Sequence, residues 1–439
     1  MAASSALHVL IDSEHAGVLE RHRDRLTFTY DDDYRSNPQA TPLSTNLPLA
    51  LQLHTGDPVV AFVDGLLPDS EAVRQRWAAE FQTRDTPFDL IAVVGEDCAG
   101  AVQFVRDQRL DQLDPGGVAW LTGEDIGAWI RQLRADPAAW LHDAELGQFS
   151  LAGAQSKFAL LGESGRWGRP HGAVPTTHIV KPASSGFANH EVNEHLSLVL
   201  ARAAGLAAAR SEIVEFDGER VVVVERFDRL VVDGHLRRVH QEDICQAIGH
   251  RPAVKYENRG GPTAATIVAL LRERSSSPAD DVSAFMDALV FNWLIANTDA
   301  HAKNYGLLLA GGECRLAPLY DLASALPYQA RLPTQRERGE LDGSRLALAM
   351  SMAGTYRLLE IRKRDLERLF ELAGLDVALQ LERTEEILDM VREQLPNVVA
   401  PVAEAFGGPM PQRFEKSVSA RLGLCRDVLA ARPSTGRRR

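Results

Sequence analysis

FNWLIANTDAHAKNYGLLLAGGECRLAPLYDLASALP, residues 291–327, runs a long apolar segment directly into a polar loop. The loop contains Asp299 and Asn304, separated by four residues, and Asp321 follows after a short interval. The residues that lead into the loop, VSAFMDALVFNWLIANT, are apolar on nearly all sides and predict a buried helix, which would give the loop a rigid base. After the loop, YGLLLA, a Gly-Gly turn and CRLAPLY predict a hairpin that ends beside Asp321.

This order of helix, loop, hairpin and acid is typical of a phosphoryl-transfer site. The reaction needs a carboxylate that takes the proton of the acceptor hydroxyl, and it needs oxygen ligands for Mg²⁺. Asp299 suits the first task, Asn304 and Asp321 suit the second, and the D-x-x-x-x-N spacing matches the catalytic loop of protein kinases. His301 or Lys303 would contact the γ-phosphate, with simple loop packing as the alternative. On spacing alone, a helix cap followed by a turn residue is the more common explanation of Asp299 and Asn304.

The preceding part of the chain supplies candidates for binding the rest of a nucleotide. Lys181 ends the apolar strand THIVK, where a cation for the α- and β-phosphates is needed. Glu191 and Glu194 lie on the next predicted helix, and we expect Glu194 to pair with the lysine. The loop AGAQSK, residues 152–157, offers small residues for backbone contact with phosphate, although it matches neither standard glycine-rich motif.

A possible adenine contact follows the same lysine strand. VVVVERFD could present backbone groups of Glu225 and Phe227 to an adenine ring, although a simple buried strand has the same pattern. The N-terminal segments ALHVLID and RLTFTYD alternate apolar and polar residues, which predicts strands. DSEAVRQRWAAEFQ predicts a helix with Asp69 or Ser70 as its N-cap.

Length and composition limit the classes of protein. A chain of 439 residues is too long for one simple core and predicts two or three packed units. The formal net charge of −12 argues against a surface that wraps nucleic acid. We expect a cytoplasmic protein without a membrane partner, because no apolar run approaches the roughly 20 residues of a membrane span. The N-terminal residues also lack a signal pattern, and the four cysteines are scattered without a CxxC pair.

The order of predicted elements gives an α+β fold in which a β-rich half precedes a helix-rich half. We expect an N-terminal β-rich subdomain over residues 1–110, the rest of an N-lobe with the phosphate loop and lysine over 111–225, and a helical C-lobe over 226–439. The cleft between two such lobes is where a small ligand would bind. Beyond residue 240, helices are predicted at 241–249, 263–274, 280–298, 363–373, 376–394 and 412–431.

Seven segments, in order between about residues 150 and 330, resemble the HipA family of bacterial serine/threonine kinases, the toxin half of a toxin–antitoxin pair. The segments are SLAGAQSKFALL, THIVKP, NEHLSLVLARAAGL, VVERFDR, HQEDICQAIG, NWLIANTDAHAKNYGLLL and LAPLYDLASALP. The N-terminal β region and the helical tail are compatible with the family. The resemblance implies a two-lobed, protein-kinase-like fold that uses ATP and Mg²⁺.

The resemblance also assigns roles to individual positions. It implies that Asp299 is the catalytic aspartate and that Asn304 and Asp321 are the two Mg²⁺ ligands. It implies that Lys181 binds the ATP phosphates and that Glu225 with Phe227 forms the adenine hinge. The flexible phosphate loop would consist of Ala152, Gly153, Ala154, Gln155, Ser156 and Lys157. Ser150 falls where the family carries an autophosphorylated serine, and a phosphate there would add about −2 charge and push the loop out. Ser156 departs from the family, because an acidic residue is expected at its position, and it places a second hydroxyl near the phosphates.

The partners implied by the resemblance are a helix-turn-helix antitoxin of the HipB type, operator DNA contacted mainly through that antitoxin, and a protein substrate such as an aminoacyl-tRNA synthetase. Phosphorylation of such a target would block translation and favour growth arrest or persistence. Two other functions remain open: a catalytically silent co-repressor that binds a DNA-binding partner, and a small-molecule phosphotransferase with a similar loop. The presence of Lys181, Asp299, Asn304 and Asp321 together favours an enzyme over the co-repressor. The N-terminal β region and the ordered matches count against the small-molecule enzyme.

Overall fold

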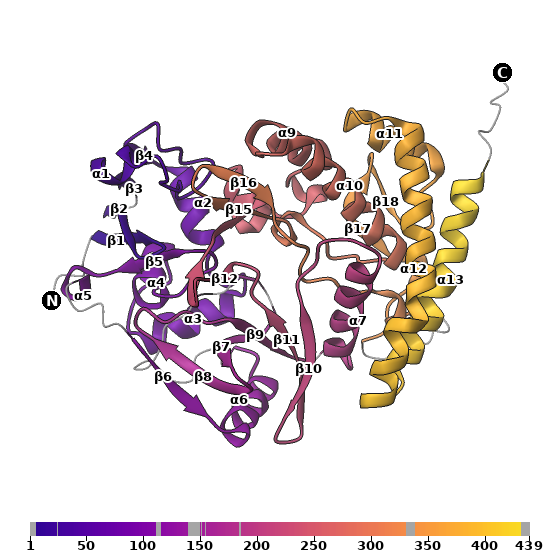
Figure 1. The fold of residues 1–439 in the computed structure, drawn as a ribbon, viewed down its shortest axis with the longest axis horizontal. Coiled ribbons are helices and arrows are strands. Elements are labelled where there is room, and N and C mark those ends of the chain that lie inside the picture. Colours follow the sequence, from indigo (N-terminus) through magenta and orange to yellow (C-terminus); the bar gives the residue numbers. More distant parts are fainter. Residues whose placement is uncertain are drawn as a thin grey trace.

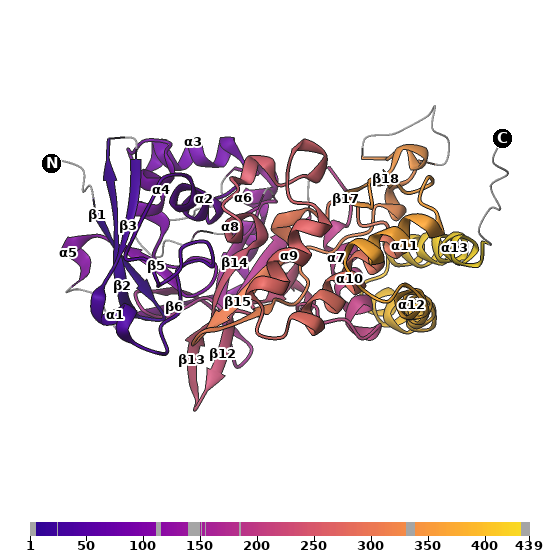
Figure 2. The same cartoon turned by 90° about the horizontal axis from the view of Figure 1, so that it is seen from above.

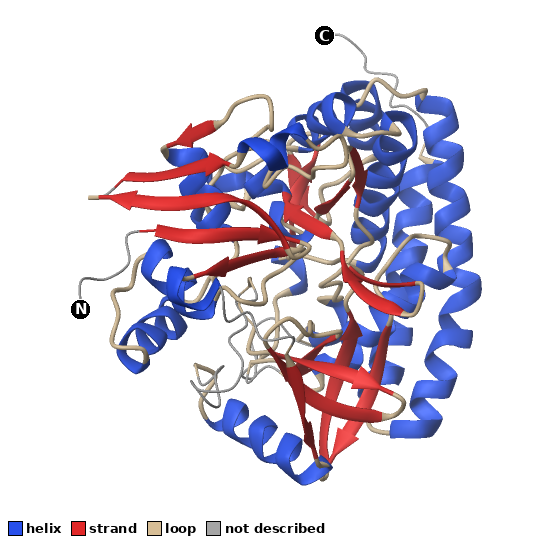
Figure 3. Cartoon of the chain, turned by 60° about the vertical axis from the view of Figure 1, so that its left-hand side comes forward, coloured by secondary structure: helices blue, strands red, loops and turns tan. Residues whose placement is uncertain are grey.

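The computed structural model describes residues 6–23, 25–110, 116–138, 150, 152–153, 155–183, 186–330 and 339–431. These residues form three parts that lie side by side in Figures 1 and 3: an N-terminal unit around one sheet, a sheet lobe around a second sheet, and a helical lobe. The predicted order, with most strands in the first half and most long helices in the second, is confirmed. Within the described part of the chain, no helix is both long and apolar enough to cross a membrane.

The N-terminal unit is an antiparallel sheet in the strand order β4-β3-β2-β1-β5, with α2 and α4 packed against it. Alternate side chains of β3 are buried, as its sequence RLTFTY predicts, because successive residues of a strand point to opposite faces. Ser70 caps α3, so the predicted helix is present with one of its two expected caps. The elements are β1 Ala6–Ile11, β2 Glu14–His22, β3 Arg25–Tyr30, α1 Asp32–Ser36, β4 Leu53–Thr55, α2 Asp57–Gly65, α3 Glu71–Glu80, α4 Pro87–Val94, β5 Val102–Val105 and α5 Asp107–Leu110.

The sheet lobe is a second antiparallel sheet, in the order β10-β11-β9-β7-β8-β6. Helix α7 contacts β10 and β11 on the side of the helical lobe, and α6 contacts β9, β10 and β11. The elements are β6 Gly117–Leu121, α6 Gly123–Ala135, β7 Phe158–Glu163, β8 Arg166–His171, β9 His178–Pro182, α7 His190–Ala203, β10 Ser211–Phe216 and β11 Glu219–Glu225.

Strand β11 connects two hydrophobic cores, which explains its unbroken apolar sequence. Val221 and Val223 belong to the core shared with the N-terminal unit, whereas Val222 and Val224 belong to the core of the helical lobe. Lys181 of β9 pairs in register with Val222. Because paired residues of adjacent strands point to the same face, this register directs Lys181 toward the helical lobe.

The helical lobe is built on α10, whose central residues are buried, with α12 and α13 packed along its outer side (Figure 1). A three-stranded sheet, β14-β15-β16, and two hairpins complete it, and Figure 2 shows the β12–β13 hairpin projecting from the body. The elements are β12 Arg229–Val232, β13 His235–Arg238, β14 His240–Asp243, α8 Ile244–Ala247, α9 Ala264–Arg274, α10 Pro278–Ile295, β15 Gly306–Ala310, β16 Glu313–Leu316, β17 Ala347–Met352, β18 Thr355–Arg357, α11 Lys363–Leu372, α12 Val377–Phe406 and α13 Met410–Ala430.

Of the six helices predicted beyond residue 240, the one at 241–249 is only partly correct. Residues 240–243 form β14, which pairs with β15 of the predicted hairpin, and α8 that follows is only four residues long. Pairing with a strand more than sixty residues away in sequence overrides the local helical pattern of the predicted helix 241–249. The other five predicted helices are present, and α12 extends past its predicted end to Phe406, through Pro396 and Pro401.

A buried carboxyl group joins the N-terminal unit to the helical lobe. Glu242 of β14 accepts hydrogen bonds from the hydroxyl of Ser44 (2.5 Å), the backbone N–H of Thr45 (2.8 Å) and the hydroxyl of Thr45 (2.7 Å). Burial raises the pKa of Glu242 to about 7, and it outweighs these three hydrogen bonds, which favour the ionised form. The folded protein therefore binds this proton more tightly than the unfolded chain does.

This raised pKa predicts a pH-dependent stability. A group with a raised folded-state pKa stabilises the protein fully below its unfolded pKa, which is 4.5 for Glu242, and loses that contribution as the pH rises through about 7. Between about pH 5 and about pH 8 the free energy of unfolding of the wild type should therefore fall relative to that of Glu242→Gln. Urea denaturation of both proteins across this range measures the difference, and parallel pH profiles would contradict the prediction.

Candidate active site

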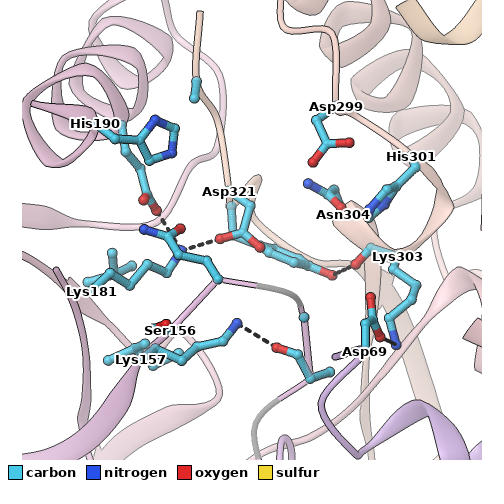
Figure 4. A pocket seen from close by; sticks show the side chains of 18 of the residues that line it. Asp69, Ser156, Lys157, Lys181, His190, Asp299, His301, Lys303, Asn304 and Asp321 are labelled. Atoms are coloured by element: carbon cyan, nitrogen blue, oxygen red, sulfur yellow. Dashed lines mark hydrogen bonds and ion pairs between the residues drawn. The ribbon is translucent and has the colours of Figure 1, made fainter. Parts of the chain in front are cut away.

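A cavity of about 970 Å³ opens where the three parts of the molecule meet. All the predicted nucleotide, metal and catalytic residues that the structure describes line it, except Ser150. They are Ala152, Gly153, Gln155, Ser156, Lys157, Lys181, Glu194, Glu225, Phe227, Asp299, His301, Lys303, Asn304 and Asp321. Ala154 lies outside the described residues. Figure 4 shows Asp299, His301 and Asn304 on one side, Lys181 and Lys157 on the other, and Asp321 between them.

Lys181 is held by acidic residues from both lobes. Its ammonium group lies 2.6 Å from a carboxylate oxygen of Glu194 on α7, so the predicted ion pair is present. Asp321 of the helical lobe also pairs with Lys181. The other candidate, Glu191, lies 3.3 Å from Arg220 instead. The lysine of the sheet lobe and the predicted metal ligand of the helical lobe therefore share one site.

The groups around Lys181 and Asp321 determine the charge of each of these two side chains. Burial alone would lower the pKa of Lys181, but the carboxylates of Asp321 and Glu194 outweigh burial and raise it above its ordinary value. Burial alone would raise the pKa of Asp321, but Lys181 and Lys157 hold it well below its ordinary range. Both groups are therefore charged at neutral pH.

The backbone at Asp321 is strained. Its φ of 53° lies in the left-handed region, which residues other than glycine rarely adopt. Such conformations persist where the surrounding structure enforces them, and they cluster at functional sites. The neighbouring Tyr320 donates a hydrogen bond to the backbone oxygen of Lys303 (2.7 Å), which ties this segment to the loop that carries Asp299.

The loop of Asp299 and Asn304 begins where α10 ends in a left-handed cap at Ala296. Asn297 donates from its side chain to Asn292 (3.0 Å), and its side-chain oxygen accepts the backbone N–H of Asp299 (3.3 Å). A 3₁₀ turn, Ala302–Asn304, then leads into β15. Asp299 is exposed to the cavity, whereas Asn304 is buried at its wall.

The two proposed γ-phosphate contacts have different surroundings. The Lys303 ammonium donates to the backbone oxygen of Gly65 (3.1 Å) and lies 3.2 Å from Asp243 and 3.5 Å from Asp69, so acidic residues already surround it. Burial, with help from the charge of Lys255, lowers the pKa of His301 to about 4, so its imidazole is neutral at pH 7. Among the described residues, the buried Nδ1 of His301 has no hydrogen-bond partner, which leaves it available for a ligand.

The predicted phosphate loop lines the cavity from the sheet-lobe side. Gly153 has a φ of 110°, a conformation that suits glycine. Lys157 donates to the backbone oxygen of Ala152, and burial lowers the pKa of Lys157 to about 8. The hydroxyl of Ser156 donates to the backbone oxygen of Pro137 (2.8 Å). Ser150 does not line the cavity; it is fully buried, and its hydroxyl donates to the backbone oxygen of Leu66 (2.7 Å).

The predicted adenine hinge is fixed by a buried charge cluster. Arg226, between Glu225 and Phe227, binds Asp228 with its guanidinium (2.8 Å) and lies 3.6 Å from Asp97 of the N-terminal unit. The backbone N–H of Arg226 donates to Thr177 (2.9 Å). Because Arg226 and Asp228 are both buried and both line the cavity, their ion pair fixes the hinge backbone at the cavity wall.

The N-terminal unit also contributes to the cavity, which is not predicted from the sequence. The turn between α2 and α3 enters the cavity, where Asp69 lies 2.6 Å from the ammonium of Lys255 and its backbone N–H donates to Gly153 (3.0 Å). Because Ser70 caps α3, the carboxylate of Asp69 is available for the lysines. From the sequence, either Asp69 or Ser70 could cap the helix, and only the fold shows that Asp69 faces the cavity.

Residues 7–105 match the HipA N-terminal domain, and residues 149–399 match the HipA-like C-terminal domain. The chain belongs to the HipA family. Asp69 lies within the first of these two regions, so the N-terminal domain of this family member contributes directly to the cavity.

Two relatives support this assignment. The kinase-like protein Y4mE of Sinorhizobium fredii (strain NBRC 101917 / NGR234) is 33% identical over 411 residues, which cover 93% of this chain and 94% of the relative. The serine/threonine-protein kinase toxin HipA of Shewanella oneidensis is 30% identical over 325 residues, 70% of this chain and 71% of that protein. The curated relatives are named as kinases, and the chain is a member of this kinase family.

A solved structure confirms the fold. HipA of Shewanella oneidensis MR-1, in a complex with HipB and its operator DNA, superposes with a TM-score of 0.81 at 24% identity. The match covers 97% of this chain and 100% of that chain. The expected two-lobed, kinase-like α+β architecture is thereby confirmed.

The side chain of Asp69 is only 12% exposed and pairs with Lys255, which predicts a large effect of its loss on stability. Asp69→Asn leaves Lys255 without this carboxylate and weakens the pairing of Lys303, so the free energy of unfolding should fall by about 3 kcal/mol. Asp57→Asn is the matched control, because Asp57 pairs with Arg251 at the surface and should change stability by less than about 0.5 kcal/mol. Urea denaturation of the three proteins measures both effects, and equal losses in the two variants would show that Asp69 has no special role.

Proposed function

We propose that this protein is an ATP- and Mg²⁺-dependent serine/threonine protein kinase that acts as the toxin of a toxin–antitoxin module. The observation that carries the proposal is the meeting of Lys181, Asp299, Asn304 and Asp321 at one cavity. Membership of the HipA family supports the same reaction class. A cavity of about 970 Å³ also falls in the size range of sites for small ligands such as nucleotides.

The residues present fit a magnesium ion. Asn304 and Asp321 offer an amide and a carboxylate oxygen at the same cavity, and Mg²⁺ prefers a few such oxygen ligands together with substrate phosphates. The ion would neutralise charge on the phosphates. Lys181 would hold the α- and β-phosphates, with Glu194 keeping its ammonium in place. The backbone at Glu225 and Phe227 would bind adenine, and the loop that contains Gly153 would cover the phosphates.

Asp299 would act as the proton acceptor. In the proposed transfer, the acceptor hydroxyl oxygen forms a bond to the γ-phosphorus, the bond between that phosphorus and the β–γ bridging oxygen breaks, and ADP leaves. The hydroxyl proton passes to the carboxylate of Asp299. Asp299 is exposed to the cavity, as this role requires, and the neutral imidazole of His301 could hydrogen-bond to the γ-phosphate. The contacts of Lys303 with Asp69 and Asp243 favour loop packing as its main role.

The proposed partners and substrate are inferred from membership of the HipA family. We propose a helix-turn-helix antitoxin of the HipB type as partner, and this support comes from the related complex of HipA, HipB and operator DNA. The net charge of −12 favours DNA contact mainly through that antitoxin. The proposed substrate is a cytoplasmic component of translation, such as an aminoacyl-tRNA synthetase. Autophosphorylation at Ser150 would require the loop to move, because its hydroxyl is buried.

The second candidate is a catalytically silent co-repressor that binds the antitoxin without transferring phosphate. The same related complex on operator DNA is the observation that favours it. A binding module has no need of an exposed carboxylate in the same cavity as a lysine with two acidic partners, so the geometry of the cavity favours the kinase.

Asp299→Asn tests the proposal. Loss of the proton-accepting carboxylate should reduce the rate of phosphate transfer by about 10²- to 10⁴-fold while nucleotide binding persists. Purified protein is incubated with Mg²⁺ and γ-labelled ATP, and mass spectrometry shows whether the label lies on Ser150. Asp280→Asn, an exposed position in the first turn of α10, is the matched control and should transfer at the wild-type rate. Nucleotide binding without transfer by the wild type would instead support the co-repressor.

A further inference from the structure

Tyr256 contacts the proposed catalytic carboxylate, a contact that the sequence does not predict. It lies between α8 and α9, in the segment HRPAVKYENRGG, residues 250–261. Its hydroxyl donates a hydrogen bond to Oδ1 of Asp299, at 2.7 Å. Within the described part of the chain, this is the only side-chain hydrogen bond or ion pair that the Asp299 carboxylate makes.

The ring of Tyr256 is held by its neighbours. It meets the imidazole of His301 edge-on, with the ring centroids 4.9 Å apart and an interplanar angle of 85°. The guanidinium of Arg259 and the ammonium of Lys255 lie 5.4 Å and 5.5 Å from the ring centroid, within the range of cation–π attraction. These contacts leave the ring in one position, with the hydroxyl directed at Asp299.

The residues on either side of Tyr256 are tied to the loop of Asp299, to the N-terminal unit and to β17. The carbonyl of Lys255 accepts the backbone N–H of Ala302 in the catalytic loop (3.3 Å), and the Lys255 ammonium lies 2.6 Å from Asp69 of the N-terminal unit. Glu257 accepts hydrogen bonds from the backbone N–H (2.6 Å) and the hydroxyl (2.9 Å) of Ser351 on β17. The segment is therefore a fixed support for Tyr256, and it would not move easily as a gate.

Asp299 is an exposed side chain on a loop, and the hydrogen bond from Tyr256 restricts its orientation. Without a hydrogen bond its carboxylate can rotate among several orientations, and phosphoryl transfer depends on accurate positioning of the proton acceptor. The bond from Tyr256 uses Oδ1 and leaves Oδ2 for the acceptor hydroxyl. Burial, followed by the hydrogen bond to Asp299, raises the pKa of Tyr256 above its ordinary value, so the phenol remains a donor at neutral pH.

We infer that Tyr256 is a positioning residue for phosphoryl transfer, whose hydroxyl fixes the Asp299 carboxylate so that its second oxygen receives the proton of the acceptor. The inference rests on the proposed kinase function. It also gives the N-terminal domain an indirect part in catalysis, because Asp69 holds the lysine that precedes Tyr256.

Tyr256→Phe tests this role, because it removes the hydroxyl and keeps the ring against His301 and Arg259. The rate of label transfer from ATP to the protein itself is measured against ATP concentration, and the thermal midpoint is recorded in parallel. We expect kcat to fall about tenfold, the loss of roughly one hydrogen bond to a charged group, with KM for ATP and the thermal midpoint close to wild type.

Tyr34→Phe is the matched control. It deletes a buried tyrosine hydroxyl that donates to the backbone oxygen of Thr41 (2.8 Å) in the N-terminal unit, away from the cavity. It should lower the thermal midpoint and leave kcat unchanged, which separates loss of stability from loss of positioning.

Two results would overturn the inference. An unchanged kcat in Tyr256→Phe would show that Asp299 does not need the hydroxyl, and an increased kcat would show that the hydroxyl blocks the acceptor site. Failure of the proposed function looks different, because the wild type itself would then transfer no label, as would Asp299→Asn. In that case the positioning role of Tyr256 is refuted together with the kinase function.

Discussion

One buried ammonium group, that of Lys181, organises the centre of this molecule. It projects from β9 because its register with Val222 turns it toward the helical lobe. There it meets Glu194 of α7 and Asp321 of the segment after β16. A buried charge is tolerated only when opposite charges surround it, so these three elements must come together in a defined arrangement. Lys181, Glu194 and Asp321 line the cavity together with the other proposed functional residues.

The N-terminal unit is part of the same construction. Its turn between α2 and α3 brings Asp69 to Lys255 and Lys303, and its loop near Ser44 encloses Glu242. The loop that carries Asp299 is thus supported by groups of the N-terminal unit and of the helical lobe. All three parts of this HipA-family protein contribute residues to the one cavity, so the N-terminal unit is part of the site and not a separate addition to it.

The sequence predicted which residues meet at the centre of the cavity and missed the residues that support them. Asp299, Asn304 and Asp321 could be found because a local order of helix, loop and hairpin carries them, and Lys181 with Glu194 because a strand and the next helix carry them. Tyr256 and Asp69 could not be found, because each meets the catalytic loop only through the tertiary fold. The helix predicted at 241–249 is only partly present for the same reason, because the pairing of β14 with β15 depends on residues far along the chain.

The most direct test of the account is nucleotide binding with and without Mg²⁺, measured calorimetrically with a non-hydrolysable ATP analogue. If Lys181 and Asp321 hold one nucleotide and its metal ion, Mg²⁺ should strengthen binding to the wild type and have little effect on Asp321→Asn. Lys181→Met should weaken binding under both conditions. An Asp321→Asn variant that keeps the full magnesium effect would contradict the account, since the metal ion would then be held elsewhere.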